Sequence, residues 1–160
     1  MAVTTSLHVA LVQPEIPWNT GNAGRTCLAL GARLHLIAPL GFSLEARQVR
    51  RAGLDYWQHV EPRVWPHWDA FAENLPRLGE PFFFSAEATR DLWSVRYPER
   101  CVLIFGGETG GLPPPLREQY RRQLVAIPMR DSPVRSLNLS TSVAVAAFEV
   151  LRQWQRNRSG

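Results

Sequence analysis

The sequence predicts a single α/β domain with a mainly parallel sheet of about six strands and helices on both faces. Short apolar runs alternate along the chain with longer stretches of helical spacing, a pattern typical of βαβ units. Cys101–Phe105 is continuously apolar, as in strands buried on both faces, and Leu7–Val12 is also suited to a buried parallel strand. Residues 1–160 suffice for one core and contain no repeat, linker or low-complexity tract. We therefore expect one domain, with a frayed tail after about residue 154.

Six apolar runs, each bounded by Gly, Pro or polar turn residues, are predicted as strands. In chain order they are Leu7–Val12, Leu34–Ile37, Trp57–Val60, Phe82–Phe84, Cys101–Phe105 and Leu124–Ile127. The fifth run is followed by Gly106–Pro115, which holds four glycines and three prolines and therefore predicts a turn.

The segments between the strands carry helix signals. Turn and N-cap residues near Thr20 predict a first helix that ends at about Leu30, before Gly31. Further helices are predicted after Ser43 as a cap, over Trp65–Leu78 with a disturbance at Pro76, and over Pro113–Tyr120.

The last predicted helix, Leu139–Trp154, has an unusually wide apolar face. Its apolar residues form two adjoining stripes at spacings of three and four. One stripe is Val143, Ala147, Val150 and Trp154, and the other is Ala144, Phe148 and Leu151. A helix on a small sheet needs only one such stripe, so we expect a second surface, as in a homodimer, to cover the rest.

The composition is that of an ordinary soluble globular chain, with 45% hydrophobic and 20% charged residues. The start of the chain lacks a basic leader, and no run approaches ~18 apolar residues, so we expect neither a signal peptide nor a membrane span. Cys27 and Cys101 lack the spacing of a zinc site or a disulfide framework. Buried free thiols in a reducing cytoplasm are the expectation, with no metal.

The basic residues are all of one type. The formal net charge is +4, and each of the 18 basic residues is Arg. Arg suits bidentate phosphate contacts and stacking on bases, so a nucleic-acid partner is one interpretation. Codon bias combined with solubility is the other. The absence of lysine excludes lysine-based catalysis.

Three polar loops follow predicted strands: Pro14–Asn22, Gly106–Pro113 and Pro128–Asn138. In an open α/β sheet, loops at the carboxyl ends of the strands form the ligand edge. The glycine loop lacks the G-x-G-x-x-G spacing of a dinucleotide site and the Gly-Lys-Ser/Thr of a P-loop.

Four side chains in and near these loops are candidates for function, each with a structural alternative. Glu108 can accept hydrogen bonds from a neighbouring loop or simply cap a helix. Arg25 can point back over the site or lie on the surface. Ser136 and Asn138 flank the start of the last helix, so at least one of them is expected as an N-cap.

The four histidines, His8, His35, His59 and His67, are scattered. His8 and His35 lie inside apolar strands and are expected as core or edge residues rather than as a catalytic base. No ordered Ser, His and Asp set stands out, so a hydrolase gets little support.

Three segments, PEIPWNTGNAGRTC, LIFGGETGGLP and IPMRDSPVRSLNLSTSVAVAAFE, together resemble the three motifs of the SPOUT superfamily of RNA methyltransferases. RRAGLDYW, between the first two, is also similar to that family. The similarity is strongest to the small branch that methylates the ribose 2′-oxygen at the wobble nucleotide, position 34, of certain tRNAs. That branch acts on cytidine or modified uridine.

The resemblance implies a trefoil knot near the carboxyl terminus and a cofactor pocket between the glycine loop and the last polar loop. It implies a homodimer through the 139–154 helix and the helix after Asn19. It also implies S-adenosylmethionine as methyl donor, contacted by Phe84, Gly106, Gly111, Ile127, Met129, Ser136 and Leu137. Arg25 matches the family's essential arginine and is expected to reach the partner's cofactor, with Asn19, Glu108, Ser136 and Asn138 as supporting polar residues.

For such a reaction we expect positioning to contribute most, with Arg25 donating to the developing alkoxide because a guanidinium rarely loses its proton. RNA phosphates would be contacted by arginines, of which the candidates are Arg47, Arg50, Arg51, Arg121, Arg122, Arg130 and Arg135. Trp18 and Trp57 could stack on a base or pack in the core. The alternatives are the same chemistry on ribosomal RNA and a non-catalytic RNA-binding member of the fold.

Overall fold

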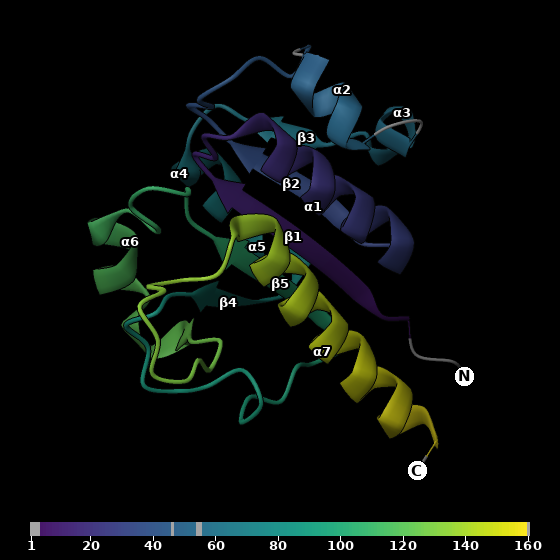
Figure 1. The fold of residues 1–160 in the computed structure, drawn as a ribbon. Coiled ribbons are helices and arrows are strands. Elements are labelled where there is room, and N and C mark those ends of the chain that lie inside the picture. Colours follow the sequence, from purple (N-terminus) through teal and green to yellow (C-terminus); the bar gives the residue numbers. More distant parts are fainter. Residues whose placement is uncertain (1–3, 46, 54–55, 160) are drawn as a thin grey trace.

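A single parallel sheet organises the chain. The computed structural model describes residues 4–45, 47–53 and 56–159. The six strands lie in the order β3-β2-β1-β5-β4-β6, and every neighbouring pair is parallel (Figure 1). The strands are β1 Ser6–Val12, β2 Arg33–Ile37, β3 Arg63–Trp65, β4 Glu80–Phe84, β5 Arg100–Phe105 and β6 Leu124–Val125.

Helices cover both faces of this sheet, as predicted. They are α1 Pro17–Leu30, α2 Arg47–Gly53, α3 Trp57–Val60, α4 Trp68–Ala72, α5 Leu75–Leu78, α6 Pro114–Gln119 and α7 Leu139–Ser159, with a 3-10 turn, η2, at Arg121–Gln123. In Figure 1 α1 and α7 run side by side across the front of the strands, and contacts between α1 and α7 agree with this view.

Alternate residues of each strand enter two separate cores. On β1, Leu7, Val9 and Leu11 pack toward α1 and α7, whereas Ala10 and Val12 pack toward α4, α5 and α6. The same alternation continues through β2, β4 and β5. Burial on both faces is why the interiors of these strands are apolar except at His8 and His35, which confirms that part of the prediction.

The third predicted strand is wrong. Trp57–Val60 is the helix α3, which packs on α1 where Gly24 leaves room: a Cβ on Gly24 would lie 3.1 Å from both the Trp57 and the Val60 side chains. The strand at this edge is Arg63–Trp65 instead, paired with His35, Leu36 and Ile37 of β2. The apolar residues of Trp57–Val60 fit either structure, and helix packing decides between them.

The single helix predicted over Trp65–Leu78 is also wrong. Trp65 ends β3, and two short helices follow. The His67 side chain caps α4 by accepting a hydrogen bond from the Ala70 N–H at 3.1 Å. Pro76 stands in the first turn of α5, where a missing N–H is tolerated, so it begins a helix rather than disturbing one.

Four boundaries differ from the expected ones. Helix α1 begins at Pro17 rather than near Thr20, because a proline is tolerated in the first turn of a helix. Ser43 accepts a hydrogen bond from Glu45 N–H in a local turn, and α2 begins only at Arg47. The last strand is shorter than predicted and ends at Val125. Helix α7 continues past the predicted end at Trp154 through Ser159, because no Gly or Pro interrupts it, and fraying of this tail stays a prediction.

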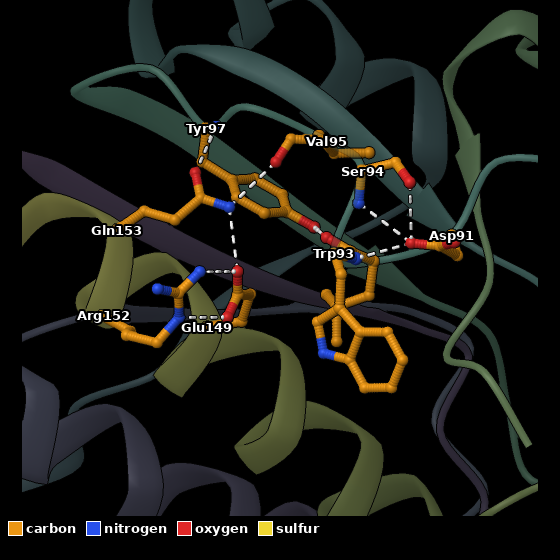
Figure 2. Close-up of polar contacts among 9 residues, drawn as sticks. Asp91, Trp93, Ser94, Val95, Tyr97, Glu149, Arg152 and Gln153 are labelled. Carbon is orange, nitrogen blue, oxygen red and sulfur yellow. Dashed lines mark hydrogen bonds and ion pairs between the residues drawn. The ribbon is translucent and has the colours of Figure 1, made fainter. Parts of the chain in front are cut away.

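The carboxyl-terminal half of α7 is fastened to the segment that leads into β5 (Figure 2). Gln153 accepts a hydrogen bond from Tyr97 N–H at 3.1 Å and donates to the Val95 carbonyl at 2.9 Å. The Trp154 indole donates to the Pro98 carbonyl at 3.1 Å. Hydrogen bonds from Arg152 hold the pKa of Glu149 below its usual value, although that carboxylate is largely buried.

Both cysteines are buried free thiols, as expected, and burial raises the pKa of each to about 12. Among the described residues, no three His, Cys, Asp or Glu side chains gather as metal ligands. Within the same ranges, no helix has the length and apolar character needed to cross a membrane.

The core histidines form one directional chain of hydrogen bonds. The Trp65 indole donates to His35 Nδ1 at 3.0 Å, His35 Nε2 lies 2.9 Å from His8 Nδ1, and His8 Nε2 lies 3.2 Å from Ser6 Oγ. An indole N–H can only donate, so neutral His35 carries its proton on Nε2 and gives that hydrogen bond to His8. His8 therefore carries its own proton on Nε2, and both rings are neutral.

We expect this chain to make the protein acid-sensitive. Burial lowers the pKa of His35 to about 3 and also lowers that of His8, to which the Arg33 charge adds. The contribution of the neutral histidines to stability is complete at pH values above 6.5, the pKa of histidine in the unfolded protein. It is lost as the pH falls from 6.5 toward about 3, the pKa of His35 in the folded protein. For each histidine that binds a proton in the unfolded but not in the folded protein, the free energy of unfolding falls by up to about 1.4 kcal/mol for every pH unit of acidification. Urea unfolding between pH 7.5 and 5 measures this slope.

The variant His35→Phe removes one titrating ring while keeping an aromatic side chain against Trp65 and Phe71, which lie beside His35 in the core. For this variant, the free energy of unfolding should depend less steeply on pH, because about one proton fewer is taken up on unfolding. An unchanged slope would show that these rings do not set the acid sensitivity.

Candidate active site

A cavity of about 500 Å³ opens at the carboxyl edge of the sheet, where the loops after β1, β4, β5 and β6 meet. This is the edge where open parallel sheets bind ligands. All the predicted site residues except Arg25 line it: Asn19, Phe84, Gly106, Glu108, Gly111, Ile127, Met129, Ser136, Leu137 and Asn138.

Glu108 joins the glycine loop to the start of α1. Its Oε1 accepts a hydrogen bond from Glu15 N–H at 2.8 Å, and its Oε2 accepts from Ile16 N–H at 2.7 Å and from Asn19 Nδ2 at 3.2 Å. Ile16 is the N-cap residue of α1 and has no side-chain acceptor of its own. The interpretation that Glu108 accepts hydrogen bonds from a neighbouring loop is therefore confirmed, and its negative charge lies favourably at the amino-terminal end of α1.

Asn19 extends this connection to the last polar loop. Its side chain is 2% exposed, and its Oδ1 accepts a hydrogen bond from Asn138 Nδ2 at 2.9 Å. Asn138 Oδ1 in turn accepts from Thr141 N–H at 3.2 Å and from Ser140 Oγ at 2.6 Å. Asn138 is thus the N-cap of α7, as one of the two candidates was expected to be. A single polar network holds the three loops together.

Glu15 is a positioning residue that the sequence did not single out. Its carboxylate accepts hydrogen bonds from Thr109 N–H at 3.1 Å and from Thr109 Oγ1 at 2.6 Å. The Thr109 hydroxyl is the main reason that the pKa of Glu15 lies below its usual value. Glu15 and Glu108 thus clamp each other's loops reciprocally. The pattern E-I-P followed by E-T is too short to reveal such a clamp without the fold.

Gly106 allows the glycine loop to fold back on itself. A Cβ on Gly106 would lie 2.0 Å from the carbonyl carbon of Gly111 and 2.0 Å from Leu112 N. Gly111 itself has φ 68°, a conformation that favours glycine. The loop thus needs glycine at both positions, and its backbone groups form one wall of the cavity.

The cavity presents hydroxyl, charged and apolar groups to a ligand. Ser136 is exposed and makes no hydrogen bond with the described residues. Arg117 also lines the wall, and its guanidinium lies 3.0 Å from Glu87. Phe84 stacks on Phe105, with ring centroids 4.7 Å apart, and gives the cavity an apolar floor.

Arg25 lies outside the cavity of its own chain. The side chain is exposed on α1, and its guanidinium lies 5.1 Å from the centroid of the Tyr56 ring. It does not point back over the site.

The expected RNA contacts are only partly available. Trp18 is 52% exposed, whereas Trp57 packs against α1 and is not free to stack on a base. Arg135 lines the cavity, and Arg121 is hydrogen-bonded to Glu118. The candidates Arg47, Arg51, Arg122 and Arg130 are exposed, and the side chain of Arg50 lies outside the described residues.

The model of the SpoU rRNA Methylase family matches residues 6–148, which include all of these loops. The chain belongs to the SpoU rRNA Methylase family. A relative from Synechocystis sp., named putative tRNA (cytidine(34)-2′-O)-methyltransferase, is 45% identical over 92% of this chain and 96% of its own. A relative from Burkholderia ambifaria, named tRNA (cytidine(34)-2′-O)-methyltransferase, is 47% identical over 91% and 94%.

Solved structures of SpoU-type proteins share the fold. One, described as "Structural insights into the 2-OH methylation of C/U34 on tRNA", has a TM-score of 0.88 and 48% identity, and covers 94% of this chain and 97% of that one. The SpoU methyltransferase AviRb from Streptomyces viridochromogenes, solved in complex with AdoMet, has a TM-score of 0.85 at 21% identity over 97% of this chain and 60% of its own. The predicted α/β class is thereby confirmed, and the trefoil knot stays a prediction of the resemblance.

Two glycines of the SpoU loop form a matched pair for a test. Gly106→Ala would force a Cβ into backbone atoms, and such overpacking costs about 2 kcal/mol, which lowers the melting temperature by about 4–8 °C. Gly110→Ala meets nothing within 4 Å and should melt within about 1 °C of the parent. Scanning calorimetry of both variants compares them. Equal melting temperatures would contradict the close approach of the loop ends.

Proposed function

We propose that this chain transfers the methyl group of S-adenosylmethionine to the ribose 2′-oxygen of the wobble nucleotide, position 34, in tRNA. The acceptor is cytidine or a modified uridine. The observation that carries the proposal is the cavity itself: three loops that match the methyltransferase motifs meet there, in a chain aligned almost end to end with relatives named for this activity. An enzyme of this kind acts in the cytoplasm, where its tRNA is.

The cavity suits the methyl donor. Its volume of about 500 Å³ lies within the range of about 300–1,000 Å³ that is typical of small-molecule sites. Main-chain groups of the glycine loop, the free Ser136 hydroxyl and the apolar Ile127 and Leu137 give the mixed lining that an adenosine with an amino-acid tail requires. The chemistry that S-adenosylmethionine supplies when bound is an electrophilic methyl group, whose bond to sulfur breaks as the ribose oxygen bonds to carbon.

The protein's contribution is positioning and charge stabilisation. Glu108, Asn19 and Asn138 hold the three loops in place before the substrates arrive. Arg25 stabilises the oxygen as its proton leaves to a phosphate of the substrate, because a guanidinium donates hydrogen bonds and keeps its own proton. Arg25 does so from the partner subunit, since it is remote from the cavity of its own chain.

A homodimer through α1 and α7 supports that role. Phe148 is 51% exposed on α7, next to Val145, while Trp18 and Leu28 are exposed on α1. In a single chain these apolar side chains face solvent, although α1 and α7 pack on each other. An exposed apolar surface over two adjoining helices is typical of an interface between identical chains.

Ribose methylation of tRNA tests the proposal directly. Purified protein, S-adenosylmethionine and tRNA from cells lacking the gene should yield 2′-O-methylation at nucleotide 34, mapped by mass spectrometry. Arg25→Ala should lower kcat by about 10²–10³-fold, as for loss of one oxyanion donor. Arg25→Lys should fail nearly as badly, because a point charge lacks the guanidinium fork.

Arg96→Lys, an exposed arginine near the other edge of the sheet, is the matched control and should retain activity. Near-normal turnover by Arg25→Lys would refute the assigned role. Methylation of ribosomal RNA instead of tRNA would favour the alternative substrate. A protein that binds RNA but neither binds S-adenosylmethionine nor transfers a methyl group would be a non-catalytic member of the fold.

A charged side chain introduced at the expected centre of the interface tests the dimer. Phe148→Glu should raise the dimer dissociation constant by about 30-fold or more, because burying an unpaired carboxylate and losing an aromatic contact costs at least ~2 kcal/mol. Val64→Glu, at a similarly exposed residue of the edge strand β3, should leave the dimer intact. Analytical ultracentrifugation measures both. A parent protein that sediments as a monomer would exclude the dimer.

A further inference from the structure

Four arginines gather at the amino-terminal edge of the sheet, opposite the cavity. Arg33, Arg63 and Arg100 are the first residues of β2, β3 and β5. Arg77 lies in α5, and its backbone carbonyl accepts a hydrogen bond from the Arg100 guanidinium. We call these four residues the amino-edge arginine cluster.

The strand register puts the three strand arginines on one face. Arg33 is paired with His8, and Arg63 with His35. Arg100 is paired with Ser6, two residues before His8, so its side chain also points to the face that carries the histidines. This is the face that α5 covers, so Arg77 joins the others at one corner of the sheet.

The cluster keeps its positive charge among the residues that the structure describes. Within the described ranges, none of the four arginines forms an ion pair with a carboxylate. The guanidinium of Arg63 lies 4.1 Å from the centroid of the Trp65 ring, and Arg77 donates to Asn74 Oδ1 at 2.8 Å. These contacts hold the side chains in place and leave their charge free.

Two carboxylates, at the start of β4 and just before β5, point the other way. Glu80 is paired with Cys101, which packs in the core on the α7 side, so Glu80 points to that side. Glu99 lines a pocket beside Trp154 of α7, again on the opposite face. The amino-terminal edge is therefore divided by charge, with arginines on one face and these carboxylates on the other.

The positive charge of the cluster also lowers the pKa values of the two neighbouring histidines. Burial is the largest cause of the low pKa of His8, and the positive charges of Arg33, Arg77 and Arg100 lower that pKa further. The pKa of His35 is lowered in the same way by Arg33, Arg63 and Arg77. The neutral imidazoles add no charge of their own beneath the cluster.

We propose that the amino-edge arginine cluster is a second contact for the RNA substrate, binding phosphates of its backbone away from the methylated nucleotide. The proposal rests on the proposed function, which brings RNA to the opposite edge. A guanidinium group binds phosphate through two parallel hydrogen bonds. Several such groups at one corner of the sheet suit a backbone with several phosphates better than a ligand with a single carboxylate. β1 has 7 residues, so the two edges are about 20 Å apart. An RNA must extend beyond the acceptor nucleotide to reach both.

The experiment measures how tRNA binding depends on salt. Arg33→Gln/Arg100→Gln removes two phosphate contacts, so the slope of log K against log salt should fall by about 1.5, and binding near 0.1 M salt should weaken about tenfold or more. KM for tRNA should rise by a similar factor, while kcat and the affinity for S-adenosylmethionine stay unchanged. Arg33→Lys/Arg100→Lys keeps the charges and should keep most of the slope.

The matched control is Arg156→Gln/Arg158→Gln, which removes the same charge from the exposed last turn of α7. It should change the slope far less than the cluster variant does. If the double variant melts early, the single variant Arg33→Gln serves, because Arg33 has no hydrogen-bonding partner among the described residues. Its slope should fall by about 0.8.

If the cluster and control variants showed equal slopes of log K against log salt, the proposal would be overturned. The salt dependence would then reflect the net charge of the protein and not a contact at the cluster. Stronger binding of a polyglutamate peptide than of tRNA would overturn it too, by identifying an acidic protein as the ligand. Failure of the parent protein to methylate any RNA would instead remove the proposed function, and the two failures are therefore distinguishable.

Discussion

The site depends on the Glu108 carboxylate. Its two oxygens accept hydrogen bonds from two backbone N–H groups and from the Asn19 amide, so the loop after β5 and the start of α1 are joined. Charge-assisted hydrogen bonds of this kind are among the stronger ones in proteins. Asn19 passes the connection on to Asn138 and hence to α7. Folding therefore orders the three loops before any ligand binds, and binding does not bear the entropy of ordering them.

Much of the fold could be predicted, because burial on both sheet faces leaves a local signature. Cys101–Phe105 is apolar throughout, Leu7–Val12 is interrupted only by His8, and both belong to inner strands. Prediction failed at the edge of the sheet, where Arg63–Trp65 has only one neighbour and too few apolar residues to stand out. Trp57 and Val60 read equally well as strand or helix, and only their packing on Gly24 makes them a helix.

The site residues could be predicted from three separated motifs, since the fold brings the loops that contain them to one cavity. What the motifs do not contain is the relation between loops. The Glu15–Thr109 hydrogen bonds join residues 94 apart, so no local pattern reveals them. The Arg25 guanidinium likewise lies against the ring of Tyr56, far along the chain. Motifs name the chemical groups, whereas tertiary contacts decide which of them face each other.

Helix α7 connects two distant parts of the molecule mechanically. It has 21 residues and is therefore about 30 Å long. Asn138 caps one end in the cavity wall. Near the other end, Gln153 and Trp154 donate hydrogen bonds to the segment before β5. Because the helix is held at both ends, the position of Asn138 in the cavity wall depends partly on contacts made roughly 20 Å away, at the opposite edge of the sheet.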